Sequence, residues 1–317
     1  MLSILLITFP FFALVLGGYL AVRGGVLPQP AIPGLNAFVL FFALPCMLYR
    51  FGAGTPVGQL LDPAAMGVYL ASALVLVGVL VAATRNARIG WNDAAFGALV
   101  GAFPNTGFMG VPLLVALLGA QAAGPAILTI VVDMVITSSL CIALSRLDGA
   151  GRHGVGVALR QAFRGIATNP MPWAIALGAL SSAMQWRLPA PVDKTLAMLG
   201  DAASPVALFT IGAVLARSQM NQHERVRAGD YVPVALAKLL LHPLLVWSIG
   251  MGAIAVGAPL AADALVVLVL VAALPSASNV SLLAERFGAN NGRVARIILV
   301  STALAFLSFS AAVALLT

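Results

Sequence analysis

Long apolar runs with very few charges follow one another along the whole 317-residue chain, and they restrict its fold more than any other feature. Each run is about 20 residues long, which is enough for a helix to cross the ~30 Å hydrocarbon core of a bilayer. The runs are continuous rather than alternating, which favours helices over the strands of a membrane barrel. We therefore predict an all-α integral membrane protein with ten transmembrane helices, at 3–22, 32–50, 66–84, 94–118, 123–146, 169–186, 195–217, 232–256, 259–285 and 294–316.

The composition excludes an ordinary soluble enzyme. Hydrophobic residues make up 61% of the chain and charged residues only 9%, whereas a soluble domain carries about 25% charged residues. Cys46 and Cys141 both lie in apolar runs and are interpreted as packing residues. The sequence has no clustered carboxylates, no His/Glu metal set and no Ser/His pair at a membrane face, so an integral-membrane enzyme is disfavoured. We predict no enzymatic activity, no metal site and no cofactor.

The basic residues predict how the chain is oriented. Of the 17 Lys and Arg residues, 13 fall in one alternating set of loops, three in the other and one inside a span. Basic residues concentrate in cytoplasmic loops, so both termini should lie outside the cytoplasm, in a cytoplasmic (inner) membrane. The longest loop, 147–168, is then a basic cytoplasmic connector. Scattered basic loops account for the net charge of +7 without a nucleic-acid partner.

The two halves of the chain resemble each other weakly but repeatedly. We interpret 1–146 and 169–317 as two five-helix repeats joined by the connector. Five spans per repeat is an odd number, so the second copy must enter the membrane from the opposite side. Inverted repeats of this kind are typical of secondary transporters that work by alternating access. The matching residues are Pro45 with Pro205 and Gly52 with Gly212, each 160 positions apart, and Pro104 with Pro275, 171 positions apart.

Two prolines near mid-membrane predict broken helices in the fourth and ninth spans. Proline lacks a backbone N–H and clashes with the preceding turn, and irregular backbone at this depth is tolerated only in a buried or wet site. Two breaks in corresponding positions indicate a transport site, in which backbone N–H groups and polar side chains bind an anion. The alternative is a pair of simple packing kinks. The predicted substrate-binding residues are Pro104, Asn105, Thr106, Gly107, Pro275, Ser276, Ser278 and Asn279.

Asp133 lies in the middle of the fifth predicted span, and Lys238 lies in the eighth, about two turns from its cytoplasmic end. An ionisable group in a span costs roughly 2.5–3.5 kcal/mol on insertion scales, so each is a functional candidate. We expect them to line or support the broken helices, and one of them to carry a coupling proton. The alternatives are a structural ion pair and a Lys238 side chain that extends to the membrane surface. Asp201 is interpreted as a helix cap, with a cavity-facing residue as the alternative. His242 is interpreted as a packed histidine bonded to a freed carbonyl, with a proton relay as the alternative.

Several motifs resemble those of the auxin efflux carrier family, and in particular its bacterial malonate transporter-like members. The run Pro104-Asn105-Thr106 is similar to the Asn-Pro-Asn crossover motif of that family, although Phe103 stands where the first Asn would be. The segments 200–212 and 237–247 carry further likeness. The resemblance covers nearly the whole chain. It implies ten spans with a scaffold part and a transport part, crossing of the broken fourth and ninth helices, transport of an organic anion, and a homodimer.

These observations together predict a secondary transporter of a small organic anion, with a malonate-like dicarboxylate favoured. Moving one negative charge into a cell against about 100 mV costs about 2.3 kcal/mol, so import would require H⁺ or Na⁺ as a coupling ion. Export could proceed without one. A monovalent cation/proton antiporter of related fold is the alternative. It is disfavoured because such antiporters use adjacent carboxylates, and Asp133 alone lies deep in a span.

Overall fold

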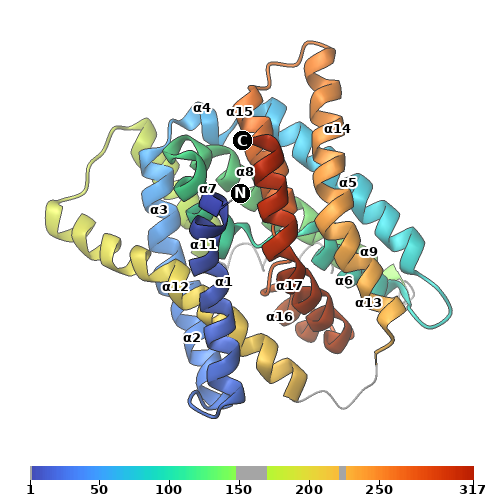
Figure 1. The fold of residues 1–317 in the computed structure, drawn as a ribbon. Coiled ribbons are helices and arrows are strands. Elements are labelled where there is room, and N and C mark those ends of the chain that lie inside the picture. The colour runs from blue at the N-terminus through green and yellow to red at the C-terminus, as the bar shows by residue number, and fades with distance from the viewer. Residues whose placement is uncertain (1, 148–169, 221–225) are drawn as a thin grey trace. The chain divides into compact units, whose positions relative to one another are not determined.

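The computed structural model describes residues 2–147, 170–220 and 226–317, and the regular elements within these ranges are all helices (Figure 1). The predicted connector 147–168 lies outside them, apart from its first residue. Seven helices within these ranges are long and apolar enough to cross a membrane: Leu6–Arg23, Gln29–Gly54, Val57–Thr84, Ala120–Ser145, Ala190–Met220, Ala228–Ala255 and Asn291–Leu316.

The other three predicted spans correspond to shorter pieces of helix. The fourth is divided into α6 (Trp91–Ala102) and a second apolar stretch, Thr106–Leu118. The sixth is α11 (Pro170–Ala183). The ninth is divided into α15 (Ala262–Ala273) and α16 (Val280–Arg286). The described part of the chain is therefore all-helical, in agreement with an integral membrane protein.

The chain divides into two compact units, and each unit contains segments from both halves of the sequence. Unit 1 comprises Met1–Asp62, Thr106–Leu128 and Asn169–Asn221. Unit 2 comprises Pro63–Asn105, Thr129–Thr168 and Gln222–Thr317. The compact units therefore do not coincide with the predicted repeats 1–146 and 169–317, because each predicted repeat contributes helices to both units.

Unit 1 is built on two close helix pairs, α1 with α12 and α3 with α11. The helix α12 runs without interruption for 31 residues although it contains Pro205. Because α12 begins at Ala190, Asp201 lies in its interior and does not cap it; it is exposed and pairs with Arg50 at 3.1 Å instead. The helices of unit 1 are α1 (Leu2–Arg23), η1 (Gln29–Ala31), α2 (Ile32–Phe38), η2 (Val39–Ala43), α3 (Leu44–Gly54), α4 (Val57–Leu60), η3 (Thr106–Gly110), α7 (Val111–Leu118), η4 (Ala120–Ala122), α11 and α12 (Ala190–Met220).

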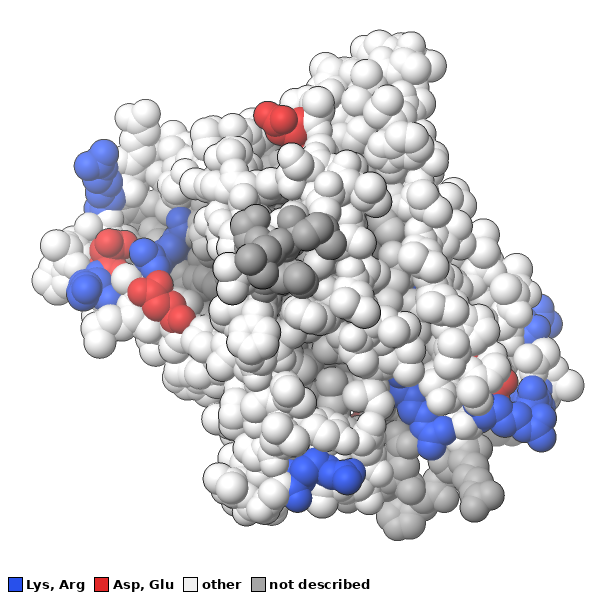
Figure 2. All heavy atoms as spheres, in the orientation of Figure 1, with Lys and Arg blue, Asp and Glu red and all other residues white. Residues whose placement is uncertain are grey.

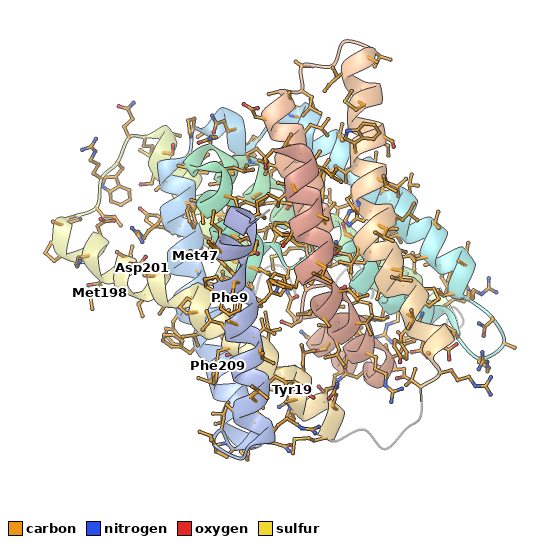
Figure 3. The ribbon with its side chains drawn as sticks, viewed as in Figure 1. Phe9, Tyr19, Met47, Met198, Asp201 and Phe209 are labelled. Atoms are coloured by element: carbon orange, nitrogen blue, oxygen red, sulfur yellow. The ribbon has the colours of Figure 1, made fainter. Side chains whose placement is uncertain are left out.

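Glycines allow α1 and α12 to approach until backbone meets backbone. A Cβ atom on Gly18 would overlap the carbonyl oxygen of Phe209, and a Cβ atom on Gly212 would overlap that of Val15. Tyr19 and Phe209, labelled in Figure 3, mark the two sides of this crossing. Small residues at such a crossing are the usual means by which membrane helices pack closely, since lipid provides no hydrophobic drive between them.

The crossing of α3 and α11 is built in the same way. Gly178 packs against the carbonyl oxygen of Tyr49, and Gly52 packs against that of Ile175. Each of these four residues lies 160 positions from its counterpart in the first crossing, which is also the spacing of the matched sequence motifs. The packing of the first predicted span on the seventh is therefore repeated in the packing of the sixth predicted span on the second.

Unit 2 places α5 against α6 and α14, and α14 against α15. The last helix, α17, packs on α6, α13, α15 and α16. One helix, α8 (Ala123–Val132), passes from unit 1 into unit 2 after Leu128. The remaining helices of unit 2 are α5 (Pro63–Thr84), α6, η5 (Asp133–Thr137), α9 (Ser138–Ser145), α13 (Ala228–Leu236), η7 (Ala237–Leu241), α14 (His242–Ala255), α15, α16 and α17 (Asn291–Leu316).

Hydrogen bonds of a buried arginine connect the first turns of three helices in unit 2. Arg293, only 3% exposed, donates to the carbonyl oxygens of Asp93 in α6 at 2.6 Å and of Asp230 in α13 at 2.7 Å. Its guanidinium lies over Gly97, where a Cβ atom would come within 2.5 Å of Nη1. The side chain of Asn290 accepts from the Arg293 amide and so caps α17. The starts of α6, α13 and α17 are thereby held together.

The surface agrees with a chain immersed in lipid. Most of the face shown in Figure 2 is uncharged, and the Lys, Arg, Asp and Glu side chains gather in small groups. Many large apolar side chains are exposed, among them Leu6, Phe41 and Leu307. A soluble domain rarely exposes large contiguous apolar areas, whereas a membrane-spanning helix needs them to contact lipid tails.

Candidate functional site

Unit 2 contains two helix breaks, and both fall at the predicted prolines. The helix α6 ends at Ala102, and regular structure resumes only at Thr106. The helix α15 ends at Ala273, and α16 begins at Val280. The physical reason is that neither Pro104 nor Pro275 can donate the next backbone hydrogen bond.

The two breaks meet and pair their backbones. Pro104 and Ser276 form an antiparallel bridge. The amide of Asn105 donates to the carbonyl oxygen of Pro275 at 2.8 Å, and the amide of Ala277 donates to that of Phe103 at 2.9 Å. Backbone groups freed by one break are therefore satisfied by the other. This pairing fixes the relative position of 103–105 and 275–277 within unit 2.

Other amides near the second break are also occupied. The amide of Ser276 donates to the Ser301 hydroxyl of α17 at 3.2 Å. The amides of Val280 and Ser281 donate to the carbonyl oxygens of Ala277 and Ser278 at 3.4 and 3.2 Å. We predicted that backbone N–H groups would face an anion, but these five amides pair within the protein. These five amides are therefore not free to bind an anion in this arrangement.

Polar side chains are buried at the breaks. Asn105 is 4% exposed, Ser276 1% and Ser278 8%. The Ser276 hydroxyl and the Asn279 side-chain oxygen are buried and have no hydrogen-bond partner among the described residues. A buried polar atom without a partner costs roughly 1–3 kcal/mol, so a hydrogen-bond partner for these two atoms would be favourable. The predicted residues brought together in unit 2 are Pro104, Asn105, Pro275, Ser276, Ser278 and Asn279.

The other two predicted site residues belong to unit 1. Thr106 and Gly107 open the π-helical turn η3, which follows the break directly along the chain. The Thr106 hydroxyl is buried and has no partner among the described residues. Within unit 1, η3 packs on α12, where the Ser204 hydroxyl donates to the carbonyl oxygen of Phe108 at 3.4 Å. The boundary between the two units therefore falls inside the predicted site sequence.

Asp133 is fully buried in unit 2 and accepts hydrogen bonds from two hydroxyls. Tyr69 of α5 donates to one carboxylate oxygen at 2.7 Å, and Thr137 donates to the other at 3.1 Å. Asp133 begins the π-helical turn η5, and the Ser138 hydroxyl donates to the Asp133 carbonyl oxygen at 2.8 Å. Single π-helical turns inside α-helices are frequent at functional sites because they redirect a side chain.

Lys238 is equally buried, and it also lies in a π-helical turn, η7. Its ammonium donates to the carbonyl oxygen of Ala272, close to the end of α15, and lies 3.2 Å from Nδ1 of His242. The Lys238 side chain is 0% exposed, so the predicted alternative of extension to the membrane surface is wrong. His242 is packed as predicted, but the prediction that it bonds a freed carbonyl is wrong, because its Nδ1 contacts Lys238 and its Nε2 has no partner among the described residues.

The two buried charges are neighbours but not a direct ion pair. Within the described residues, no contact of 4.0 Å or less joins Asp133 to Lys238, although their charges interact through space. Tyr69 contacts Asp133 through its hydroxyl, and its ring centroid lies 5.8 Å from that of His242, the neighbour of Lys238. A direct structural ion pair, one of the predicted alternatives, is therefore not what these residues form.

The sequence analysis overlooked Tyr69, Thr137, Ser301 and Arg293. Tyr69, Thr137 and Ser301 are single hydroxyl-bearing residues inside apolar runs, and nothing in their spacing sets them apart from packing residues. Arg293 precedes an apolar run and reads as an ordinary basic loop residue. Across the described ranges, no group of three or more His, Cys, Asp or Glu residues could hold a metal ion.

Comparison with known proteins places this geometry in a family. Residues 4–313 match the family described as "Membrane transport protein". The chain is 29% identical over 303 residues to a protein of Rhizobium meliloti (strain 1021) named "Putative malonate transporter", covering 93% of this chain and 90% of that protein. It is 26% identical over 283 residues to the "Uncharacterized transporter YfdV" of Escherichia coli (strain K12), covering 88% and 86%. It is 30% identical over 125 residues to "Auxin efflux carrier component 4" of Arabidopsis thaliana, covering 37% and 19%.

Proposed function

Because the chain belongs to the membrane transport protein family, which includes auxin efflux carriers, we propose that this membrane transporter moves a small organic anion. The favoured substrate is a dicarboxylate such as malonate. Family and relatives alike are transporters rather than enzymes, in agreement with the sequence. The observation that carries the proposal is the meeting of the two helix breaks at Pro104 and Ser276.

The chemistry of the breaks suits a carboxylate. Asn105, Ser276, Ser278 and Asn279 provide neutral donors, and no Asp or Glu side chain lies within 103–105 or 274–281 to repel an anion. The relative named for malonate transport aligns over nearly the whole of this chain, which favours a small dicarboxylate over an aromatic acid. Thr106 and Gly107 follow the first break directly along the chain and stay predictions from the sequence.

We further propose ten spans arranged as two inverted repeats, with both termini outside the cytoplasm. Support comes from the two glycine crossings of unit 1, whose contacting residues correspond at one constant offset of 160 positions. The excess of basic residues in one set of loops supports the orientation. Alternating access would follow from exchanging the conformations of the two repeats. A homodimer remains a prediction from the family resemblance.

Asp133 and Lys238 are proposed as the coupling or supporting pair of this site. Lys238 contacts the carbonyl oxygen of Ala272 near the end of α15, just before the second break. Asp133 accepts a hydrogen bond from Tyr69, whose ring lies near that of His242, the neighbour of Lys238. Import of an anion against the membrane potential requires a coupling cation, and a proton carried by one of these groups would supply it. No other cofactor is proposed.

The test is uptake of labelled malonate into proteoliposomes that hold the purified protein under an imposed proton gradient. We expect gradient-dependent uptake that Asn105→Ala abolishes. The control is Asn86→Ala, which changes an exposed loop asparagine far from the breaks in sequence. Uptake of ²²Na⁺ in place of malonate under the same gradient would instead favour the cation/proton antiporter. Failure of malonate, succinate and glutarate to enter under any gradient would refute the dicarboxylate proposal.

A further inference from the structure

The break in the ninth predicted span leaves the end of α15 with backbone groups that need partners. In an unbroken helix, the Ala272 carbonyl oxygen would accept from the amide of Ser276. That amide donates to the Ser301 hydroxyl instead. The carbonyl end of α15 is therefore open for capping by a side chain, and the side chain that caps it is Lys238. A cation is favourable there, because a helix carries partial negative charge at its C-terminal end.

A second polar contact, with His242, also holds the Lys238 ammonium in place. The ammonium is completely buried, and its second polar contact is Nδ1 of His242, one turn later on the same helix. A protonated Lys238 can only donate, so in that state Nδ1 is the acceptor and the imidazole is neutral, with its proton on Nε2. That Nε2 atom is buried and has no partner among the described residues. His242 thus provides a polar partner for Lys238, while its own Nε2 atom has no hydrogen-bond partner among the described residues.

The other face of the His242 ring is fixed by Tyr69. The two rings are 5.8 Å apart and tilted by 41°, and the Tyr69 hydroxyl donates to Asp133. The charged or titratable groups described around His242 are therefore Lys238 on η7, Tyr69 on α5 and, through Tyr69, Asp133 on η5. A continuous line of contacts leads from the buried acid through Tyr69, His242 and Lys238 to the carbonyl beside the second break.

From this geometry we infer that His242 is a positioning residue of the proposed transport site. It accepts a hydrogen bond from Lys238 and so directs the ammonium onto the Ala272 carbonyl, which holds the end of α15 and the break at 274–277 in its paired arrangement. The role of His242 in transport rests on the proposed function, whereas its role in holding the break at 274–277 does not. It gives His242 a role in which the acceptor atom, rather than the bulk of the ring, matters.

A matched pair of variants separates these two properties. In His242→Asn the side-chain oxygen can take the place of Nδ1 as acceptor, whereas His242→Leu has the same branched shape without any acceptor. The full-length purified protein and both variants would be compared by hydrogen–deuterium exchange of the amides in 274–281. Thermal unfolding would be recorded in parallel as a measure of general damage. The exchange readout does not depend on which substrate the protein carries.

We expect exchange across 274–281 to become at least about tenfold faster in His242→Leu, and to stay within about twofold of the unmodified protein in His242→Asn. Equal exchange in the two variants would overturn the inference: equally fast exchange would make ring packing the cause, and equally slow exchange would mean that His242 holds nothing. Faster exchange in the Asn variant alone would also overturn it.

Malonate uptake by the same proteins connects the inference to transport. We expect His242→Leu to raise KM more than it lowers the maximal rate, because the site geometry is disturbed, and His242→Asn to restore KM. If the unmodified protein does not transport malonate, the proposed function fails while the exchange comparison still decides the role of His242. If uptake is normal and KM is unchanged in both variants, the transport role of His242 is refuted.

Discussion

Replacement of Tyr69 by Phe is the perturbation that most sharply tests the buried network of unit 2. It removes only the hydroxyl, which donates to the Asp133 carboxylate at 2.7 Å and also interacts with Thr129. The aromatic ring and its contact with His242 remain, so no cavity is created. Asp133 would keep a single side-chain donor, Thr137 at 3.1 Å, in a site with no solvent exposure.

The magnitude follows from the charge and the burial of the acceptor. A hydrogen bond to a charged group contributes roughly 1.5–3 kcal/mol, and a buried acceptor that loses its donor retains the penalty of desolvation. A suitable control is Tyr49→Phe, which removes a 3.1 Å hydrogen bond between two neutral hydroxyls, Tyr49 and Ser181, in a half-buried position. That bond should contribute only about 0.5–1.5 kcal/mol.

The assay is thermal unfolding of both variants in detergent, with tryptophan fluorescence as the readout. We expect Tyr69→Phe to lower the apparent Tm by about 3–6 °C and Tyr49→Phe by less than about 3 °C. In uptake measurements, Tyr69→Phe should also change the pH profile, since it alters the hydrogen bonding of the proposed coupling acid. A Tyr69→Phe protein that is as stable as Tyr49→Phe and has an unaltered pH profile would refute the reasoning.

Three further predictions concern the helix crossing, the buried charges and the arginine. Gly18→Ala should destabilise the protein by about 3 kcal/mol, because the new methyl group overlaps a carbonyl of α12, whereas Gly17→Ala should be tolerated because its Cβ atom would meet only an aromatic ring at 3.9 Å; equal melting temperatures of the two would contradict the close crossing. Asp133→Asn and Lys238→Met should each lower stability by roughly 1.5–3 kcal/mol, because each removes a hydrogen-bonded buried charge, and the double variant should lose less than the sum, because both groups belong to one chain of contacts through Tyr69 and His242; strict additivity in chemical unfolding would mean that the two groups do not interact. Arg293→Lys should reduce stability by roughly 1.5–3 kcal/mol, because one of the two carbonyl hydrogen bonds is lost; an unchanged unfolding midpoint would show that those bonds contribute nothing.

The sequence was most informative where a single physical rule dominates. Apolar runs of membrane-spanning length predict helices because a backbone in lipid must satisfy its own hydrogen bonds. The prolines predict where helices end, and α6 and α15 do end just before Pro104 and Pro275. Membership of the family also follows from motifs in the sequence, and the match over 4–313 confirms it.

What the sequence could not predict depends on contacts between distant segments. That the amides of Asn105 and Ala277 pair with the opposite break, rather than with a ligand, is a long-range arrangement that no local pattern encodes. The role of Tyr69 requires α5 to lie beside η5, and that of Arg293 requires three helix starts to converge. The π-helical turns at Asp133 and Lys238 likewise redirect two side chains by a residue, which periodicity alone does not predict.

The central claim is that the paired breaks of unit 2 form the binding site for a small dicarboxylate. Titration calorimetry of malonate with the purified protein tests it most directly, with Asn105→Ala as the site variant and Asn86→Ala as the control. We predict saturable binding in the unmodified and control proteins, and at least about tenfold weaker binding, or about 1.4 kcal/mol, in Asn105→Ala. Malonate binding of equal affinity in all three proteins would contradict the claim and place the site elsewhere.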